Sequence, residues 1–326
     1  MTFLRVWNFF QLRLSYYLSR VVRKPIHWGL PVAISIEPTT ACNLRCPQCP
    51  SGLRQFTRPT GNLKPDVNKI ILQKFGNRLQ YINYYFQGEP FINSHITELF
   101  KEARRRNIYT ITSTNAHFIS SQTAHQIVDS GLHELIISID GTTQQTYENY
   151  RVEGKLEKVL EGINHLVEAK RMKQSALPLI TFQFLVTRQN EHQLPEIKKL
   201  ADELGADRLT LKTVQVYDVD NAAELIPENE KFARYRINED GKPVLKNKFR
   251  NSCWRSWSSC VVTWDAKIVP CCFDKDAKYQ FGNLLEQNLQ DAWKNTIAAD
   301  FQQKILTDRK QIDICRNCSE GSKIWI

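Results

Sequence analysis

Between residues 32 and 213 the chain alternates short apolar segments with longer segments of helical periodicity, and this alternation limits its possible folds most. The six βα repeats favour an α/β fold with a parallel sheet, and a curved, open sheet suits their number. The expected strands are 32–37, 80–86, 108–113, 134–139, 179–186 and 207–212, and the expected helices are 67–78, 94–106, 120–130, 155–172 and 192–204.

Three cysteines follow the first expected strand in the spacing CxxxCxxC, namely Cys42, Cys46 and Cys49. Three thiolates in one tight loop can bind three corners of a cubic iron–sulfur cluster, whereas four would close every iron. The missing ligand leaves one iron open to a small molecule, as in catalytic metal sites. The alternatives are a zinc site or three unrelated thiols. Zinc sites favour paired CxxC or Cys/His groups, and no histidine lies near this loop.

The cysteine spacing resembles that of the radical S-adenosylmethionine (SAM) enzymes. This resemblance implies that the open iron of a [4Fe–4S] cluster binds SAM, and that an electron from the cluster cleaves SAM to a 5′-deoxyadenosyl radical. It also implies a partial (β/α)6 TIM-like barrel with its chemistry at the carboxyl ends of the strands. The segment Gly88, Glu89 and Pro90 after the second strand strengthens the resemblance, because the family has a GEP segment there that receives the SAM amino group.

Polar residues at the next strand ends are further candidates for SAM binding by the same resemblance. Ser113 and Asn115 close the third strand, and their groups can hydrogen-bond ribose or methionine atoms. Ser138 and Asp140 close the fourth strand, where alternation would put both on one side. Arg151 stands where related enzymes keep an arginine for the SAM carboxylate. Loop capping and surface ion pairs are the alternative roles for these residues.

Three more positions bear on the barrel interior. Gln183 and Lys212, on the fifth and sixth strands, can point over the cofactor, or can serve as a strand hydrogen bond and a solvated charge. Gln48 replaces an aromatic residue that many family members place near adenine. We therefore expect the adenine contact to come from elsewhere, such as the last two strands of the barrel.

The other six cysteines follow residue 250. They resemble the auxiliary-cluster module called SPASM in its shortened form, sometimes called twitch, and this implies one auxiliary [4Fe–4S] cluster with Cys253, Cys271, Cys315 and Cys318 as ligands. Ala266 replaces the glycine of that module, which a turn tolerates if its φ stays negative. A zinc ribbon is the alternative, since four thiolates also suit zinc. Two thiols are left over, Cys260 and Cys272, and a buried apolar role is the default for each. Cys272 could also replace Cys271 as the ligand.

The first 31 residues carry five of the basic residues and no acidic ones, in a chain whose net charge is +10. A helical projection gathers their large apolar residues on one broad face, with most of the basic residues elsewhere. This pattern is typical of an amphipathic helix on an anionic membrane surface. The alternative is a helix packed on the domain or on a partner. The expected parts are therefore this helix at 1–31, the barrel at 32–250 and the auxiliary-cluster domain at 251–326.

These features predict an enzyme that takes hydrogen from a substrate C–H bond, with the auxiliary cluster passing electrons. We expect a reductase or flavodoxin-type electron donor. The clustered cysteines suit a reducing cytoplasm, with peripheral membrane contact through residues 1–24. The sequence leans toward a small metabolite, sugar or lipid-linked substrate. The alternatives are a peptide or protein maturase and, from another class, a zinc-binding RNA-associated protein, although nucleic acid is not the expected partner.

Overall fold

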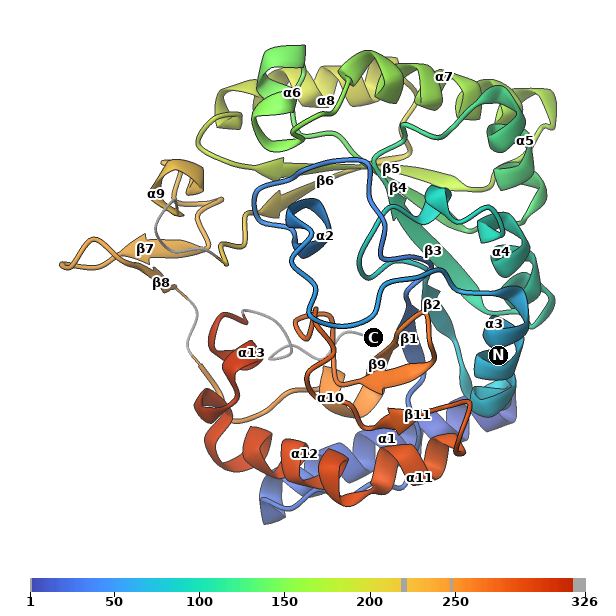
Figure 1. Ribbon diagram of the computed structural model, residues 1–326, viewed down its shortest axis with the longest axis vertical. Helices are drawn as coiled ribbons and strands as arrows, with labels where there is room; N and C mark the ends of the chain where they lie inside the picture. Colours follow the sequence, from blue (N-terminus) through green and yellow to red (C-terminus); the bar gives the residue numbers. More distant parts are fainter. Residues whose placement is uncertain (1, 218–221, 247–248, 319–326) are drawn as a thin grey trace.

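The computed structural model describes residues 2–217, 222–246 and 249–318. Its main sheet has nine strands in the order β11-β10-β9-β1-β2-β3-β4-β5-β6 (Figure 1). Strands β1 to β6 are parallel neighbours, which confirms the parallel α/β sheet expected from the alternating pattern. Their bounds are β1 (Ala33–Ile36), β2 (Tyr81–Asn83), β3 (Tyr109–Thr114), β4 (Glu134–Ser138), β5 (Leu179–Val186) and β6 (Arg208–Thr213).

The crossover helices occupy the expected stretches between these strands. They are α3 (Pro65–Phe75), α4 (Ile96–Arg105), α5 (Ser121–Asp129), α7 (Leu156–Met172) and α8 (Leu194–Glu203). Local chemistry explains their starts: a proline stands in the first turn of α3 and α8, and the Ser120 side chain accepts a hydrogen bond from the backbone of Thr123 to cap α5. Short elements that we did not expect are α2 (Pro50–Leu53), α6 (Gln144–Tyr150) and η2 (Pro90–Ile92). The turns η1 (Gly76–Arg78) and η3 (Glu191–Gln193) fall at the ends of expected helices.

The C-terminal segment extends the barrel sheet. Strand β9 (Ser259–Val262) pairs in parallel with β1, and β10 (Lys267–Val269) and β11 (Gly282–Asn283) continue the sheet in antiparallel fashion. Trp254, Trp257 and Trp293 are buried in the same apolar core as the barrel strands. The remaining elements are α9 (Ala222–Leu225), β7 (Tyr235–Ile237), β8 (Pro243–Leu245), α10 (Arg255–Ser258), α11 (Leu289–Lys294), α12 (Thr296–Asp308), η4 (Arg309–Gln311) and α13 (Asp313–Arg316). The domain limits near residues 31 and 250 stay a prediction, and residues 319–326 lie outside the described part.

The expectation that Ala266 keeps a negative φ is wrong for the turn between β9 and β10. Ala266 has a φ of 66°, so it does not keep the negative φ under which a non-glycine residue was expected to be tolerated. This left-handed conformation is the one that glycine adopts most readily. The Ala266 methyl group is fully buried in the core, and its burial offsets part of the backbone strain.

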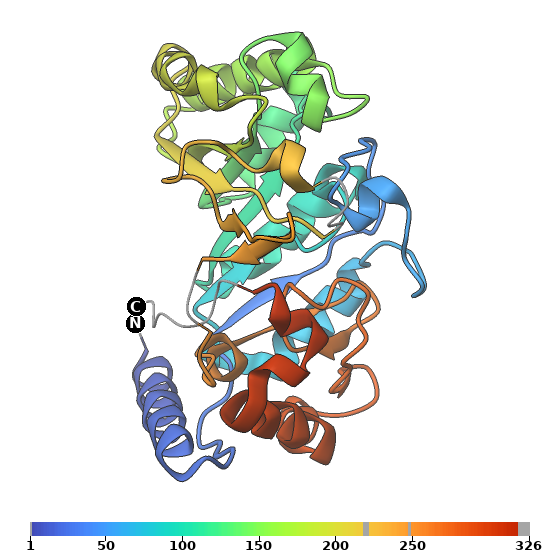
Figure 2. The same ribbon diagram turned by 90° about the vertical axis from the view of Figure 1, so that its left-hand side faces the viewer.

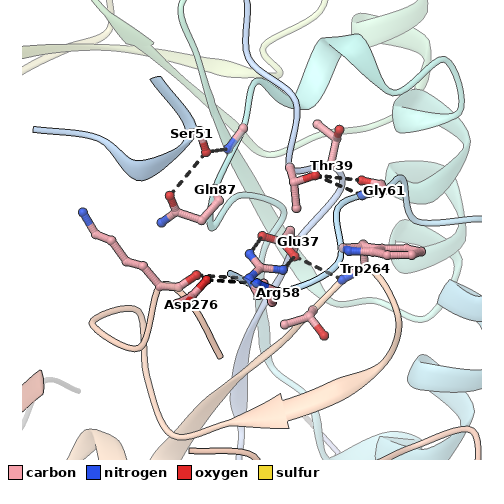
Figure 3. A network of polar contacts seen from close by, with 12 residues as sticks. Glu37, Thr39, Ser51, Arg58, Gly61, Gln87, Trp264 and Asp276 are labelled. Carbon is pink, nitrogen blue, oxygen red and sulfur yellow. Dashed lines mark hydrogen bonds and ion pairs between the residues drawn. The ribbon is translucent and has the colours of Figure 1, made fainter. Parts of the chain in front are cut away.

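A polar network joins the end of β1 to the C-terminal segment (Figure 3). The Arg58 guanidinium donates to both carboxylate oxygens of Glu37, at 2.9 and 2.5 Å. The backbone N–H of Trp264 also donates to Glu37, at 3.3 Å. The Asp276 carboxylate accepts hydrogen bonds from the backbone N–H groups of Thr57 and Arg58. The loop after the cluster cysteines is thus tied to both β1 and the C-terminal segment.

Helix α1 (Phe3–Val22) lies at the outer edge of the molecule, beside the C-terminal helices (Figure 2). Its inward residues pack on η1 and α10. Tyr16 contacts two core tryptophans, with ring centroids 5.2 Å from Trp254 and 5.4 Å from Trp257. The N-terminal segment is therefore docked on the folded chain. Among the described residues, none of the helices combines the length and the apolar character of a transmembrane segment.

Candidate functional site

The three cysteines of the CxxxCxxC loop line one cavity of about 390 Å³ at the carboxyl ends of the barrel strands. Cys46 is buried, while Cys42 and Cys49 are half-buried. Burial is the main cause that raises the pKa of Cys42 to about 12. A buried thiol of this kind gives up its proton when a metal centre supplies the compensating positive charge. The cavity therefore lies between the cysteine loop, with its three thiols, and the carboxyl ends of the barrel strands.

Hydrogen bonds join the cysteine loop to the GEP segment. The Ser51 hydroxyl accepts from the backbone N–H of Gly88 at 2.8 Å, and the backbone N–H of Glu89 donates to the Ala41 carbonyl at 2.7 Å. A Cβ on Gly88 would lie 2.4 Å from the Thr39 carbonyl oxygen and 2.7 Å from that of Ala41. Only glycine allows this approach of two backbones, so the two loops form one wall of the cavity.

Glu89 is a buried anchor for the end of β3. One carboxylate oxygen accepts from the Thr114 hydroxyl at 2.7 Å, and the other accepts from the backbone N–H of Asn115 at 2.7 Å. Burial raises the pKa of Glu89, and these hydrogen bonds oppose the rise. The Asn115 amide then donates to the side chain of Asn43 at 2.8 Å, which links β3 to the cysteine loop. The carboxylate therefore orients the strand end that faces the cavity.

Arg151 connects the barrel to the central cysteine. Its Nε donates to an Asp140 carboxylate oxygen at 2.5 Å, and its Nη1 lies 3.8 Å from the Cys46 sulfur. Burial acts to lower the pKa of Arg151, but the Asp140 carboxylate overrides this and raises it well above its usual value. The arrangement keeps a permanent positive charge beside Cys46, where it can stabilise a thiolate or an anionic cluster.

Most of the residues expected at the SAM site line this cavity. Those in the lining are Gly88, Glu89, Ser113, Asn115, Ser138 and Arg151, together with Gln183 and Lys212. Whether they contact SAM stays a prediction.

Asp140 and Pro90 are not in the lining. The expected alternation of Ser138 and Asp140 fails because β4 ends at Ser138, and the side chain of Asp140 is fully buried. Its second carboxylate oxygen accepts from the backbone N–H of Leu185 at 2.7 Å. Pro90 begins η2 and is buried. Asp140 and Pro90 are therefore buried next to the cavity and stabilise the residues that line it.

Three cavity residues had no clear signal in the sequence. Tyr217 follows β6, and its backbone N–H donates to the Gln48 side chain at 2.7 Å. Lys275 stacks over the Tyr217 ring, with Nζ 3.6 Å from the centroid, and burial lowers its pKa to about 8. Arg234 donates to the Thr213 hydroxyl at 3.1 Å. The strand-end rule could have identified Tyr217, whereas Lys275 and Arg234 are brought in from segments outside the six barrel strands.

A second, small cavity gathers the predicted auxiliary ligands. Its lining includes all four of Cys253, Cys271, Cys315 and Cys318, with Arg309 beside them. Cys260 is instead fully buried on β9, and Cys272 lies outside this lining, 3.8 Å from Arg255 Nη1. This separation agrees with treating Cys260 and Cys272 as the left-over thiols.

The two thiol sets suit clusters better than single ions. In residues 2–217, 222–246 and 249–318 no group of three His, Cys, Asp or Glu side chains is arranged to hold one metal ion. The three thiols of the first cavity border a space of about 390 Å³, which can hold a centre with several iron atoms, and the four thiols of the second cavity border about 20 Å³. The soft sulfur ligands, the glycine approach at Gly88 and the positive charge of Arg151 all fit an iron–sulfur cluster at the first cavity. The four thiols of the second cavity fit another.

Comparisons with known proteins identify two regions of the chain. The family model "Radical SAM superfamily" matches residues 36–201, and the model "SPASM: Iron-sulfur cluster-binding domain" matches residues 253–319. A PqqA peptide cyclase of Bradyrhizobium diazoefficiens is 31% identical over 266 residues, covering 75% of this chain and 67% of that protein. A tungsten-containing aldehyde ferredoxin oxidoreductase cofactor-modifying protein of Pyrococcus furiosus is 25% identical over 315 residues, covering 87% and 86%.

A solved structure has the same fold. Streptococcus suis SuiB bound to S-adenosylmethionine superposes with a TM-score of 0.64 at 16% identity, covering 90% of this chain and 73% of that chain. An identity this low supports a common fold only. The barrel and the C-terminal segment thus share their fold with a protein whose solved structure contains S-adenosylmethionine.

Proposed function

The chain belongs to the radical SAM superfamily and carries a C-terminal SPASM module, and on this premise we propose that it is an enzyme that modifies a peptide. The observation that carries the proposal is the first cavity, where CxxxCxxC, the GEP segment and Arg151 converge. This family membership removes the zinc-binding RNA-associated protein from consideration.

In the proposed enzyme Cys42, Cys46 and Cys49 would hold a [4Fe–4S] cluster. When bound, that cluster would supply the one-electron chemistry by which SAM is activated to take hydrogen from the substrate. Arg151, fixed by Asp140, keeps its charge beside Cys46. Glu89 orients Thr114 and Asn115 toward the cofactor. These residues bind and orient, and the cofactor performs the difficult step.

The second cavity extends the proposal to electron transfer. Cys253, Cys271, Cys315 and Cys318 would hold one auxiliary [4Fe–4S] cluster, which corresponds to the twitch form of the module. Such a centre accepts or relays electrons for the substrate. A reductase or flavodoxin-type protein would deliver the electron that starts the reaction.

A peptide substrate is now better supported than the small metabolite, sugar or lipid-linked intermediate toward which the sequence leaned. The relative at 31% identity is named a peptide cyclase. A neighbouring cavity of about 350 Å³ shares Gln48, Tyr217 and Lys275 with the first cavity, so an extended molecule can reach the reaction centre from that side. Lys212, Arg234 and Lys275 line the first cavity with positive charge. This wall favours a peptide with a carboxylate near the modified residue.

Reductive SAM cleavage tests the reaction class. The anaerobically reconstituted protein, mixed with dithionite and SAM, is expected to produce 5′-deoxyadenosine, measured by liquid chromatography and mass spectrometry. Replacing Cys46→Ala should abolish the product. Cys260→Ala is the matched control, because it removes a thiol that lies outside both cavities. Full activity in the Cys46 variant would refute the proposed cluster ligands.

Hydrogen transfer tests the substrate class. Short peptides encoded beside the gene would be prepared with deuterated side chains and incubated with enzyme and SAM. Deuterium in 5′-deoxyadenosine would identify a peptide as the substrate. Glu→Gln forms of that peptide should react less well, because they lack the carboxylate that Lys212, Arg234 and Lys275 would attract. If no such peptide transfers deuterium while a deuterated small molecule does, the peptide proposal fails and the reaction class stands.

A further inference from the structure

Helix α1 docks on the protein through its more polar side. Asn8, Ser15 and Ser19 are buried, together with Leu12 and Tyr16. The Asn8 amide donates to the Leu30 carbonyl at 2.9 Å, while its oxygen accepts from the Leu30 backbone N–H at 3.0 Å. The Ser19 hydroxyl accepts from the Ile26 backbone N–H at 2.9 Å. These specific bonds fix which side of the helix faces inward.

The opposite side of the helix is apolar and exposed. A surface helix normally turns its apolar stripe to the core and its polar residues to water. Helix α1 buries Leu12 and Tyr16 but leaves most of its large apolar residues exposed. Trp7 and Phe10 stack on each other with ring centroids 5.8 Å apart, and the helix lies at the edge of the molecule (Figure 2). The residues of this α1 apolar face, 41% to 80% exposed, are Phe3, Leu4, Val6, Trp7, Phe10, Leu14, Tyr17, Val21 and Val22.

The charges around the α1 apolar face indicate what covers it. Residues 1–31 contain no aspartate or glutamate. Arg20, Arg23 and Lys24 are exposed at the end of the helix. Arg5 does not contribute, because its guanidinium donates to the carbonyls of Arg106 and Asn107. A surface of aromatic and aliphatic side chains next to exposed positive charge complements anionic lipid headgroups above a hydrocarbon layer.

We propose that α1 is an interfacial anchor that lies flat on an anionic lipid bilayer, with the α1 apolar face in the membrane. The helix is not apolar enough to cross the bilayer, since no described helix is. It lies outside both regions matched by the family models. Because the buried side of α1 holds the helix on the core, the anchor also orients the whole enzyme on the membrane. This inference does not depend on the substrate or on SAM cleavage.

Vesicle co-sedimentation of the full-length reconstituted protein tests the anchor. Vesicles of phosphatidylcholine with 30% phosphatidylglycerol are expected to bind the protein, and Phe10→Glu with Leu14→Glu should weaken binding at least tenfold. The matched control is Met172→Glu with Ile237→Glu, which places the same charges on exposed apolar positions of other elements and should bind like wild type. Both double variants should still form 5′-deoxyadenosine.

The lipid composition and the positive charges give an independent measurement. Replacing Arg20, Arg23 and Lys24 by glutamine should lower affinity for the anionic vesicles roughly 100-fold. Wild type should bind pure phosphatidylcholine weakly. Equal binding of wild type and the Phe10/Leu14 variant would overturn the proposal. The proposal would also be overturned if wild type did not bind the vesicles and instead formed a dimer in light scattering. In that case the Phe10/Leu14 variant would be a monomer.

Discussion

Gly88 shows how one residue can determine the shape of the site. Its φ of 75° favours glycine, and its Cα faces two carbonyl oxygens of the loop that leads to the cluster cysteines. Gly205 has a similar φ of 69°, but no atom lies within 4 Å of a Cβ built there. Substitution of Gly205 therefore has only the energetic cost of the positive φ. Substitution of Gly88 has that cost and also the cost of a steric clash between Cβ and the two carbonyl oxygens.

We expect Gly88→Ala to destabilise the protein by about 2 kcal/mol more than Gly205→Ala, because only the first substitution forces two backbones apart. It should also lower SAM affinity at least tenfold. Chemical denaturation and equilibrium SAM binding of both variants provide the check. Similar losses for the two variants would show that the close approach at Gly88 is not important.

Asp140 acts through Arg151. The carboxylate is fully buried, and it is the partner that lets a guanidinium remain charged beside Cys46. Removing one partner of a buried ion pair leaves the other charge without compensation, which costs more than the intact pair contributes.

Asp140→Asn is therefore expected to lower the free energy of unfolding by about 3 kcal/mol. Glu161→Gln, in the exposed Lys158–Glu161 pair, should produce no measurable change. Urea denaturation of the reconstituted proteins measures both. The assignment is wrong if the Asp140 variant is as stable as the Glu161 variant and binds SAM equally well.

At the scale of elements, His27 fastens the segment after α1 to the C-terminal helices. Its ring stacks on Trp257 with centroids 5.5 Å apart, and Nε2 hydrogen-bonds the side-chain oxygen of Gln302 on α12. Burial lowers the pKa of His27 to about 4, the Gln302 hydrogen bond opposes this, and Lys294 adds to the lowering. The half-buried ring is therefore neutral at neutral pH.

This docking should make stability depend on pH. In the unfolded chain a histidine has a pKa of about 6.5, so between pH 6.5 and 4 the unfolded state binds more protons and the folded state loses stability as the pH falls. At pH 5.5 the loss from His27 is about 1 kcal/mol relative to neutral pH. We expect His27→Phe to remove this part of the slope in denaturation measured from pH 7.5 to 5.5. An unchanged slope would mean that His27 binds protons equally in the folded and the unfolded protein.

At the scale of the whole molecule, the barrel and the C-terminal segment form one structure. Strand β9 continues the sheet beyond β1, and the Glu37–Arg58 pair ties the cysteine loop to both. The two cysteine cavities are thus held in one body, which suits electron transfer between two clusters.

Metal analysis tests this arrangement. The reconstituted protein should contain about eight iron and eight sulfide per chain, as two [4Fe–4S] clusters require. Cys315→Ser should reduce this to about four, while Cys272→Ser should retain the wild-type content. Two zinc and no sulfide in the wild-type protein would contradict the assignment of both sites.

Much of the fold followed from local patterns. The crossover helices and barrel strands lie within a few residues of their expected positions, because apolar periodicity reports directly on which residues a parallel sheet buries. Most of the expected cavity residues line the cavity for a related reason, since the carboxyl ends of parallel strands meet at one edge. Asp140 was expected to line the cavity but does not, because β4 ends at Ser138. The position at which a strand ends depends on its hydrogen bonds to neighbouring strands, and the sequence pattern does not report these.

The amino-acid pattern by itself determined the family, the parallel sheet and the two sets of thiols, because spacing along the chain carries that information. Tertiary structure decided which residues complete the site: Lys275 and Tyr217 meet only when the C-terminal segment folds against the barrel. It also decided the direction of α1. A helical projection identifies an apolar face but not whether a core or a lipid surface covers it, and here Asn8 and Ser19 occupy the inward side.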